Sequence, residues 1–421
     1  RFFIKVTGSS FYRLFVNGEF TGYGPARAAH DYYRVDYWEI TEKLKESDNV
    51  VAVEVAGYNV NGYYSLDQPA FLQAEVISNG EVLIATGIGK DEFDTFQVLQ
   101  LNNRVQKVPR YSFQRPFMEA YRLDKGFDDW LYGDFTSSEL LETAIMPSKK
   151  TLNRNVCYPE FIKVNPIAIV ANGTVATDIK RNEYWKDRSL VNIGEKLKGY
   201  KECELSCNPS IEVQDLKVVE LNNENNNFYS DRPIKLESNN FITYRFPKNM
   251  SGFIGAELNI SKSGKIYFIF DEMLTDGDLK FNRTNTINII SFDLQPGKYK
   301  VESFEPYTLQ YLKVLMVGGD GEIKETYLRE YTNTEVKATF SSSDVLLNEI
   351  YNAGIESFRQ NSVDLFTDCP SRERAGWLCD SYFMGRAAMA ISGNTVVEKN
   401  FMENYMLPKK FEYIPNGMLP M

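Results

Sequence analysis

Hydrophobic and polar residues alternate in short runs over the first third of the chain, and turn residues separate the runs. Residues 14–20 read Leu-Phe-Val-Asn-Gly-Glu-Phe, and residues 71–84 hold a second pair of runs around Asn79-Gly80. Asn-Gly is the preferred dipeptide of two-residue type I′ turns, so both segments predict β-hairpins. Together with the alternating run at 50–55, this spacing predicts a β-sandwich.

Alternation returns between residues 216 and 336. Residues 253–270 predict a hairpin, with a turn at Lys262-Ser263-Gly264-Lys265. Further strands are expected at 289–294, 297–304 and 311–317. A second sandwich follows from this pattern, whereas the mixed stretch at 181–207 resists assignment.

The spacing of the hydrophobic residues changes at Phe340, from the two-residue period of strands to the period of helices. Ser341-Ser342-Ser343-Asp344 is typical of a helix N-cap. Apolar residues then recur with helical spacing and predict one stripe, and two more helices are expected at 373–390 and 395–406. The stripe consists of Leu347, Ile350, Tyr351, Gly354 and Phe358.

Composition narrows the class of protein. At 421 residues the chain suggests roughly three domains. With 43% hydrophobic and 25% charged residues it is not wholly disordered, and no apolar run approaches the roughly 18 residues of a membrane span. A net charge of −10 without a basic cluster argues against nucleic acid as a partner. For Trp130 and Trp185, packing in a core is favoured over a sugar platform.

Histidine and cysteine usage excludes several chemistries. His30 is the single histidine, so a histidine-rich metal site is excluded, and any Ser-His-Asp arrangement would depend on it. We predict no metal site. Five cysteines do not make a disulfide framework, and free buried thiols are favoured over one bridge. The disulfide state of Cys157, Cys203 and Cys207 stays open.

The densest group of reactive side chains lies at 368–380, Asp-Cys-Pro-Ser-Arg-Glu-Arg-Ala-Gly-Trp-Leu-Cys-Asp. A helix starting near Ser371 would place Glu373, Trp377 and Asp380 on one face, with Asp368 just before it. Two neighbouring carboxyl groups suit glycoside hydrolysis, which needs a proton donor and a second carboxylate. Spacing alone nevertheless favours a solvated Arg-Glu-Arg helix start.

This segment resembles the signature of the bacterial α-L-rhamnosidases, glycoside hydrolase family 78. In that family an Asp-Cys-Pro-x-Arg run leads to Glu-Arg-x-Gly-Trp and ends in Asp. Residues 340–351 are similar to the family's entry into its catalytic (α/α)6 barrel, and residues 304–314 to a strand of its concanavalin-like domain. Residues 15–18 and 38–41 are similar to its N-terminal sandwich.

The resemblance implies a multidomain fold with two jelly-roll-like β-sandwich domains before the start of an (α/α)6 barrel. Residues 1–150 would form the N-terminal, galactose-binding-like sandwich. Residues 151–336 would form the concanavalin-like sandwich, with an unassigned insert near 180–215. Residues 337–421 would supply the first helices of a truncated barrel.

The resemblance also implies roles for the residues of the motif. Glu373 matches the general acid, and the positions that bind the sugar are Asp368, Arg372, Trp377 and Asp380. No cofactor is required. Because the family inverts the anomeric configuration, a general base must activate water, and we expect that residue beyond Met421. The 421-residue chain alone is then expected to be inactive.

The expected activity is the release of terminal α-L-rhamnose from a glycan or glycoside. Two alternatives stay open: an exo-glycosidase for another deoxy sugar on the same fold, and a carbohydrate-binding protein without catalysis. The resemblance favours a bacterial protein outside the cytoplasm over a cytoplasmic one. A homodimer is one option for its assembly.

Overall fold

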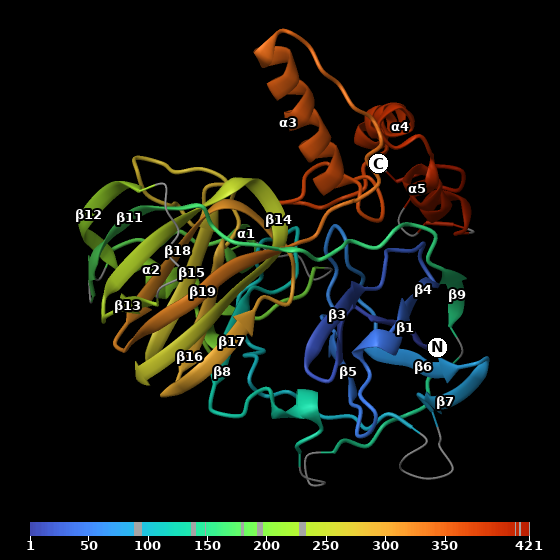
Figure 1. Cartoon of the computed structure of the whole chain (residues 1–421), viewed down its shortest axis with the longest axis horizontal. Coiled ribbons are helices and arrows are strands. Elements are labelled where there is room, and N and C mark those ends of the chain that lie inside the picture. Colours follow the sequence, from blue (N-terminus) through green and yellow to red (C-terminus); the bar gives the residue numbers. More distant parts are fainter. Residues whose placement is uncertain are drawn as a thin grey trace.

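Two β regions lie side by side, and three longer helices stand at one end of them (Figure 1). The computed structural model describes residues 1–87, 95–135, 140–147, 149–177, 181–191, 197–226, 233–408, 410–411 and 414–420, without the side chains of 224–226. No helix in these ranges is long and apolar enough to cross a membrane.

The first β region has a five-stranded and a three-stranded sheet that share one core. Ile4 and Val6 of one sheet and Leu14 of the other are fully buried in it. The strand order is β7-β6-β1-β4-β9 in the larger sheet and β3-β2-β5 in the smaller. The strands are β1 (Phe2–Ser9), β2 (Phe11–Val16), β3 (Glu19–Gly24), β4 (Tyr32–Glu39), β5 (Val51–Ala56), β6 (Phe71–Ser78), β7 (Glu81–Ala85) and β9 (Lys150–Asn153).

Both predicted hairpins of this region are confirmed. β2 pairs with β3 and β6 with β7, each across an Asn-Gly turn. Asn17 and Gly18 have φ of 51° and 80°, and Asn79 and Gly80 have φ of 49° and 85°. Positive φ at both central residues is what a type I′ turn requires, so the dipeptide determines the turn locally.

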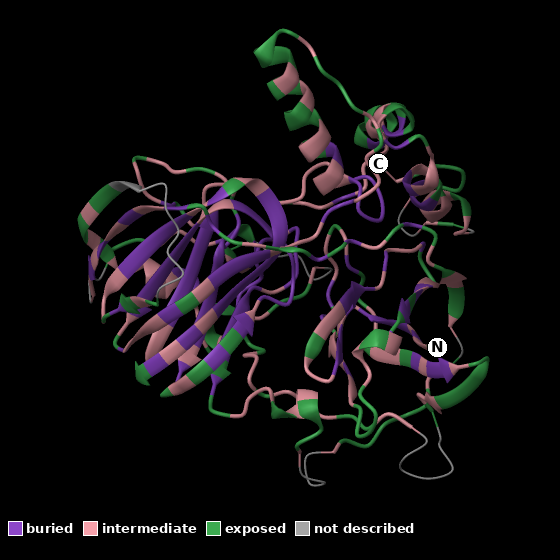
Figure 2. Cartoon of the chain, in the orientation of Figure 1, coloured by how far each residue is buried: buried purple, intermediate pink, exposed green. Residues whose placement is uncertain are grey.

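The second β region is an eleven-stranded sheet system that curls around the larger core of the molecule. Its interior is almost entirely buried (Figure 2). The main path runs β10-β19-β14-β18-β15-β16-β8. The strands are β8 (Glu119–Leu123), β10 (Lys163–Val164), β11 (Ala168–Ala176), β12 (Lys217–Asn226), β13 (Ile234–Leu236), β14 (Asn240–Lys262), β15 (Gly264–Asp271), β16 (Ile289–Leu294), β17 (Gly297–Glu302), β18 (Tyr307–Val317) and β19 (Asp320–Glu330).

The hairpin predicted at 253–270 is wrong, although both of its strands exist. β14 is 23 residues long, and its register on β18 shifts between Arg245 and Met250. Its second half pairs with β17 and β19, whereas β15 pairs with β16 and β18. β14 thus changes partners along its length, and β18 separates it from β15 in the strand order.

One early strand belongs to the second region. β8 runs parallel to β16 at the edge of the large sheet, although it lies within residues 1–150. The buried carboxylate of Glu119 in β8 accepts hydrogen bonds from the amides of Phe304 and Glu305 and from the hydroxyl of Tyr307. These bonds hold the chain between β17 and β18 and explain why β8 lies there.

The stretch at 181–215, which the pattern left unassigned, contains only short helical elements in its described residues. They are α1 (Arg188–Val191), a 3₁₀ turn (Glu202–Glu204) and α2 (Pro209–Gln214). Two further 3₁₀ turns lie in the N-terminal part, at Thr41–Lys43 and Asp129–Tyr132.

From residue 337 onward the described chain contains helices and no strands, as the change of period predicts. The helices are α3 (Val345–Asn361), α4 (Leu378–Ser392) and α5 (Val396–Met406). Asp344 caps α3 by accepting a hydrogen bond from the amide of Leu346 at 2.9 Å. The predicted cap is therefore confirmed.

The apolar stripe of α3 is not buried as its spacing would suggest. Phe358 is buried, but Leu347 and Ile350 are 47% and 59% exposed. The N-terminal half of α3 projects away from the remainder of the molecule (Figure 1), so only its C-terminal end packs on other elements.

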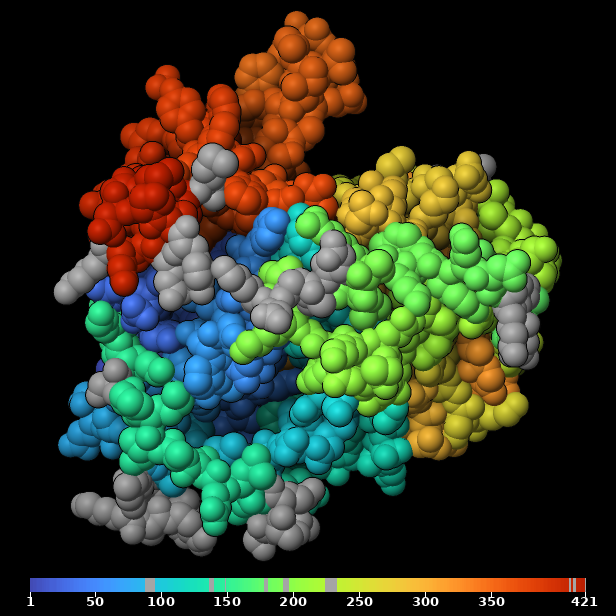
Figure 3. Space-filling model, turned by 180° about the vertical axis from the view of Figure 1, so that it is seen from behind, coloured from blue at the N-terminus to red at the C-terminus, as the bar shows by residue number. Residues whose placement is uncertain are grey.

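Ion pairs and a small apolar cluster join the helical segment to the first β region. The Arg27 guanidinium bonds to Asp364 at 2.6 Å, and the buried Arg34 pairs with Glu403 of α5. Ala26 packs in one cluster with Phe366 and other residues of the helical segment. The C-terminal helices are seated on the N-terminal residues when the molecule is seen from behind (Figure 3).

We predict that Asp364→Asn destabilises the protein in a pH-dependent manner. Burial by itself raises the pKa of Asp364, but Arg27 outweighs burial and lowers the pKa to about 2. An unfolded aspartate ionises near pH 4, so the pair contributes fully above that pH and is lost as the pH falls towards about 2. Urea unfolding at pH 7 should show a loss of about 2 kcal/mol that shrinks between about pH 4 and 2.

The matched control for this variant is Asp276→Asn, because Asp276 is 91% exposed and lies 3.8 Å from Lys280. Its effect should stay within about 0.5 kcal/mol at every pH. A loss for Asp364→Asn that does not change with pH would contradict the assignment of the stabilisation to the charge of Asp364.

Candidate active site

The motif at 368–380 forms a folded loop before α4, and the helix predicted from Ser371 is wrong. Residues 370–373 form a turn, and α4 begins at Leu378 with Trp377 at its N-cap. Side chains of the loop accept hydrogen bonds from two of its own backbone amides, and a helix from Ser371 would need that of Ala375 for its first intrahelical bond. The Asp368 carboxylate accepts from the amide of Ala375 at 3.0 Å, and the Cys369 sulfur accepts from the amide of Glu373 at 3.3 Å.

The loop nevertheless brings Glu373 and Trp377 together. The indole Nε1 of Trp377 donates to Glu373 Oε2 at 2.9 Å, and Arg372 donates to Oε1 at 2.8 Å. The Glu373 side chain is 13% exposed, so it is mostly buried among these partners. The geometry presents a carboxylate held at both oxygens, beside an aromatic ring.

A third donor to Glu373 comes from the β part of the chain and was missed in the sequence. Gln114 Nε2 donates to Oε1 at 2.8 Å across a separation of 259 residues. Tyr63 also stands edge-on to the ring of Trp377, with centroids 5.7 Å apart. The signal in the sequence was the dense polar and aromatic stretch 110–115, but nothing in it indicated the partner.

Asp368 is a second partly buried carboxyl group in the loop. Burial raises the pKa of Asp368, and the Glu373 carboxylate raises it further, against hydrogen bonds from Cys369 and Ala375 that lower it. The Cys369 thiol donates to Asp368 Oδ2 at 3.1 Å. Asp368 and Glu373 are therefore close enough to influence each other's charge.

Asp380 is placed differently from the other predicted site residues. It lies exposed in the first turn of α4 and makes no hydrogen bond or ion pair within the described ranges. Because α4 starts only at Leu378, Asp380 does not share a helix face with Glu373. The predicted arrangement of the two on one helical face is wrong.

The buried carboxylate of Glu305 anchors the motif loop to the sheets. Glu305 accepts from Tyr64 at 2.5 Å, from Arg115 at 3.3 Å and from Arg374 at 3.4 Å. Burial by itself raises the pKa of Glu305, but the Arg115 and Arg374 guanidinium groups outweigh burial and lower the pKa. Arg115 also donates to the carbonyl of Ser371 in the loop at 2.8 Å.

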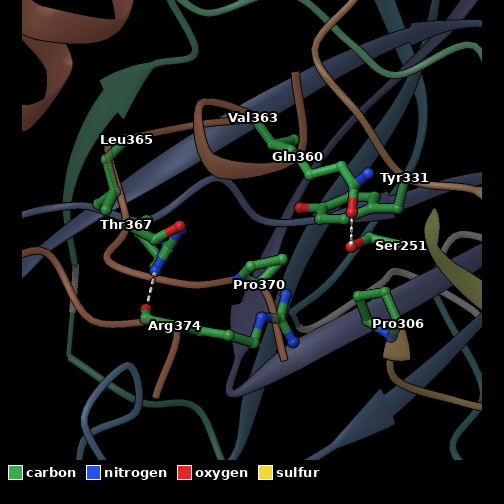
Figure 4. Close-up of a pocket in the computed structure, with 10 residues that line it drawn as sticks. Ser251, Pro306, Tyr331, Gln360, Val363, Leu365, Thr367, Pro370 and Arg374 are labelled. Atoms are coloured by element: carbon green, nitrogen blue, oxygen red, sulfur yellow. Dashed lines mark hydrogen bonds between the residues drawn. The ribbon is translucent and has the colours of Figure 1, made fainter. Parts of the chain in front are cut away.

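A small hollow lies between the motif loop and the neighbouring residues of the chain. Pro370 and Arg374 line it together with Ser251, Tyr331 and Gln360, and Gln360 accepts a hydrogen bond from Ser251 (Figure 4). Its volume is about 20 Å³, which is enough for one water molecule and too small for a sugar. Glu373 is not among the residues that line the hollow. The hollow therefore belongs to the contact between the motif loop and the sheets and is not a substrate pocket.

Other candidate residues have structural partners. Trp185 packs edge-on against Phe281 at the border of the larger core, as core packing predicts. Trp130 is half-buried and stands edge-on to Phe15. All five cysteines are free thiols, but the expectation that they are buried is wrong. Three of them are exposed, namely Cys157, Cys203 and Cys379, and Cys207 and Cys369 are only partly buried.

Comparison with known families bears on the motif directly. Residues 335–421 match the family model of the bacterial α-L-rhamnosidase six-hairpin glycosidase domain. The resemblance to the bacterial α-L-rhamnosidases is confirmed. None of the curated proteins compared with the chain matches it.

Solved structures of rhamnosidases share the fold of the chain. The family 78 rhamnosidase of Bacillus sp. GL1 matches with a TM-score of 0.74 and 16% identity over 95% of this chain and 59% of that one. The α-L-rhamnosidase of Dictyoglomus thermophilum matches at 0.61 and 16%, over 97% and 40%. The Streptomyces avermitilis α-L-rhamnosidase, solved with L-rhamnose, matches at 0.60 and 15%, over 97% and 34%. The chain thus spans from about a third to three-fifths of these rhamnosidases.

We predict that Arg115→Met loosens the motif loop. The change removes the bond to Ser371 and leaves the buried Glu305 with one guanidinium partner, so the free energy of unfolding should fall by about 3 kcal/mol. Hydrogen exchange of the amides at 371–375 should accelerate. Arg122→Met is the control, because Arg122 is 59% exposed and its ion pair with Asp293 is 3.9 Å long. Equal stability of the two variants would contradict the anchoring role.

Proposed function

We propose that the chain is part of an inverting glycoside hydrolase that releases terminal α-L-rhamnose from glycans or glycosides. The observation that carries the proposal is the Glu373 carboxylate, held by Trp377 and Arg372 inside the segment that matches the rhamnosidase family model. A carboxyl group on an accessible loop, beside an aromatic ring, suits protonation of a glycosidic oxygen.

Glu373 acts in this proposal as the general acid. A general acid must carry a proton when substrate is bound. Arg372 is 48% exposed and is free to turn towards a sugar hydroxyl. Its departure on substrate binding would leave the Glu373 carboxyl group with two neutral donors, Gln114 and Trp377.

The other residues of the motif bind the sugar in this proposal. Asp368 and Asp380 accept hydrogen bonds from rhamnose hydroxyls, and Trp377 lines the pocket. Asp380 is unpaired in the described structure and therefore available to a ligand. Inversion also requires a second carboxylate that activates water, usually about 6.5–9.5 Å from the acid, and we assign no residue of this chain to that role.

The domain organisation follows the same proposal. Residues 1–150 and 151–336 supply two sandwich domains in this proposal, except that β8 joins the second β region and β9 the first. Residues 337–421 contribute the first helices of an (α/α)6 barrel. The exposed apolar residues of α3, among them Val345, Leu346 and Ile350, support this, because barrel helices bury such faces against their neighbours. An exo-glycosidase for another deoxy sugar is the alternative within the same geometry.

We predict that Glu373→Gln impairs hydrolysis most for poor leaving groups. The change keeps the shape of the side chain but removes the proton, and general acid catalysis is worth roughly 10²–10⁴-fold. kcat/KM should therefore fall far more for an alkyl than for an activated aryl α-L-rhamnoside. The measurement uses the complete natural polypeptide that contains these residues. Asp380→Asn is the comparison, with similar losses on both substrates, and equally small losses for Glu373→Gln would place the acid elsewhere.

We predict that the first product is β-L-rhamnose. Proton NMR during the first turnovers of an α-L-rhamnoside should show the β anomer before mutarotation, because direct attack by water inverts the anomeric centre. Initial appearance of the α anomer would contradict the inverting pathway. No release of rhamnose, with binding of the sugar retained, would favour the alternative of a non-catalytic carbohydrate-binding protein.

A further inference from the structure

Two side chains, Arg372 and Gln114, donate hydrogen bonds to Oε1 of Glu373. They differ in how deeply they are buried. Arg372 is 48% exposed, whereas Gln114 is 6% exposed. Gln114 reaches Oε1 through its amide nitrogen and Arg372 through its guanidinium, so both act as donors to that oxygen. Gln114 is thus the fixed partner of Oε1, and Arg372 the one that substrate can draw away.

The backbone around Gln114 is fixed on both sides. Its carbonyl accepts from the amide of Tyr63 at 2.8 Å, and its own amide donates to Ser112 Oγ at 3.2 Å. The next residue, Arg115, is fully buried and bonds to the carbonyl of Ser371. Two successive residues of the β part therefore hold the motif loop, one by its carboxylate and the other by its backbone.

We propose that Gln114 is a positioning residue that orients the Glu373 carboxyl group from the β part of the chain. With Gln114 on Oε1 and the Trp377 indole on Oε2, rotation of the carboxyl group is restrained at both ends. The β region then completes the active site and does more than carry the helical segment. This inference rests on the proposed role of Glu373 as the acid.

Gln114→Met tests the inference because methionine has a similar length and no donor. kcat on an alkyl α-L-rhamnoside should fall roughly tenfold to a hundredfold, the loss expected for a hydrogen bond to a charged group. The loss on an activated aryl rhamnoside should be smaller, because only transfer of the proton is affected. KM should change little, because Gln114 orients the acid and does not bind the sugar.

Gln114→Glu provides a graded second variant. It replaces the donor by a second carboxylate that repels the Glu373 carboxylate, so the loss of kcat on the alkyl rhamnoside should exceed that of Gln114→Met. Gln360→Met is the matched control. Gln360 also bridges the sheets and the helical segment, through Ser251 and the carbonyl of Asn249, but does not touch Glu373. It should leave both the leaving-group dependence and KM unchanged.

A double mutant separates this inference from the proposed function. Gln114→Met should add no further loss in a Glu373→Gln background, because both changes act on one proton transfer. A selective effect of Glu373→Gln, with Gln114→Met behaving like Gln360→Met or adding its loss independently, overturns the inference alone. Absence of a selective effect of Glu373→Gln overturns the proposed function, and this inference with it.

Discussion

The arrangement of the molecule depends on one buried carboxylate shared by two guanidinium groups. Glu305 lies between β17 and β18, Arg115 precedes β8, and Arg374 belongs to the motif loop. Burying a charge is costly unless its partners satisfy it, and here the Tyr64 hydroxyl supplies a third donor. Since the three charged residues come from distant parts of the chain, the motif loop can take its shape only when the sheets are already in place.

Ion pairs of this kind suit the contact between segments that are far apart in the sequence. Two apolar surfaces in contact can shift relative to each other. A guanidinium that donates to a carboxylate through two nitrogens fixes the direction of the contact as well as its distance. Arg27 bonds to Asp364 in this way, and Arg34 holds Glu403. These pairs determine how the C-terminal helices stand on the first β region, and with them where the motif loop lies.

Hydrogen bonds within the motif loop hold its backbone in an irregular conformation. Asp368 and Cys369 bind the backbone amides of Ala375 and Glu373 and keep the loop from becoming the first turn of α4. The Glu373 side chain lies in this loop and is 13% exposed, with Trp377 beside it. A helix starting near Ser371 would instead have bonded the amide of Ala375 to the carbonyl of Ser371.

The sequence by itself determined the features that depend on neighbouring residues. The two Asn-Gly turns, the Asp344 cap, the helix ending at Met406 and the change from strands to helices near residue 337 all follow from local conformational preferences. Tertiary structure alone decided the partners of β14 and β15, the exposure of the α3 stripe and the irregular loop before α4. It also decided that Gln114 meets Glu373, because a hydrogen bond across 259 residues leaves no periodic signal in either segment. Local preference selects an element, but only packing of the whole chain selects the element's partner.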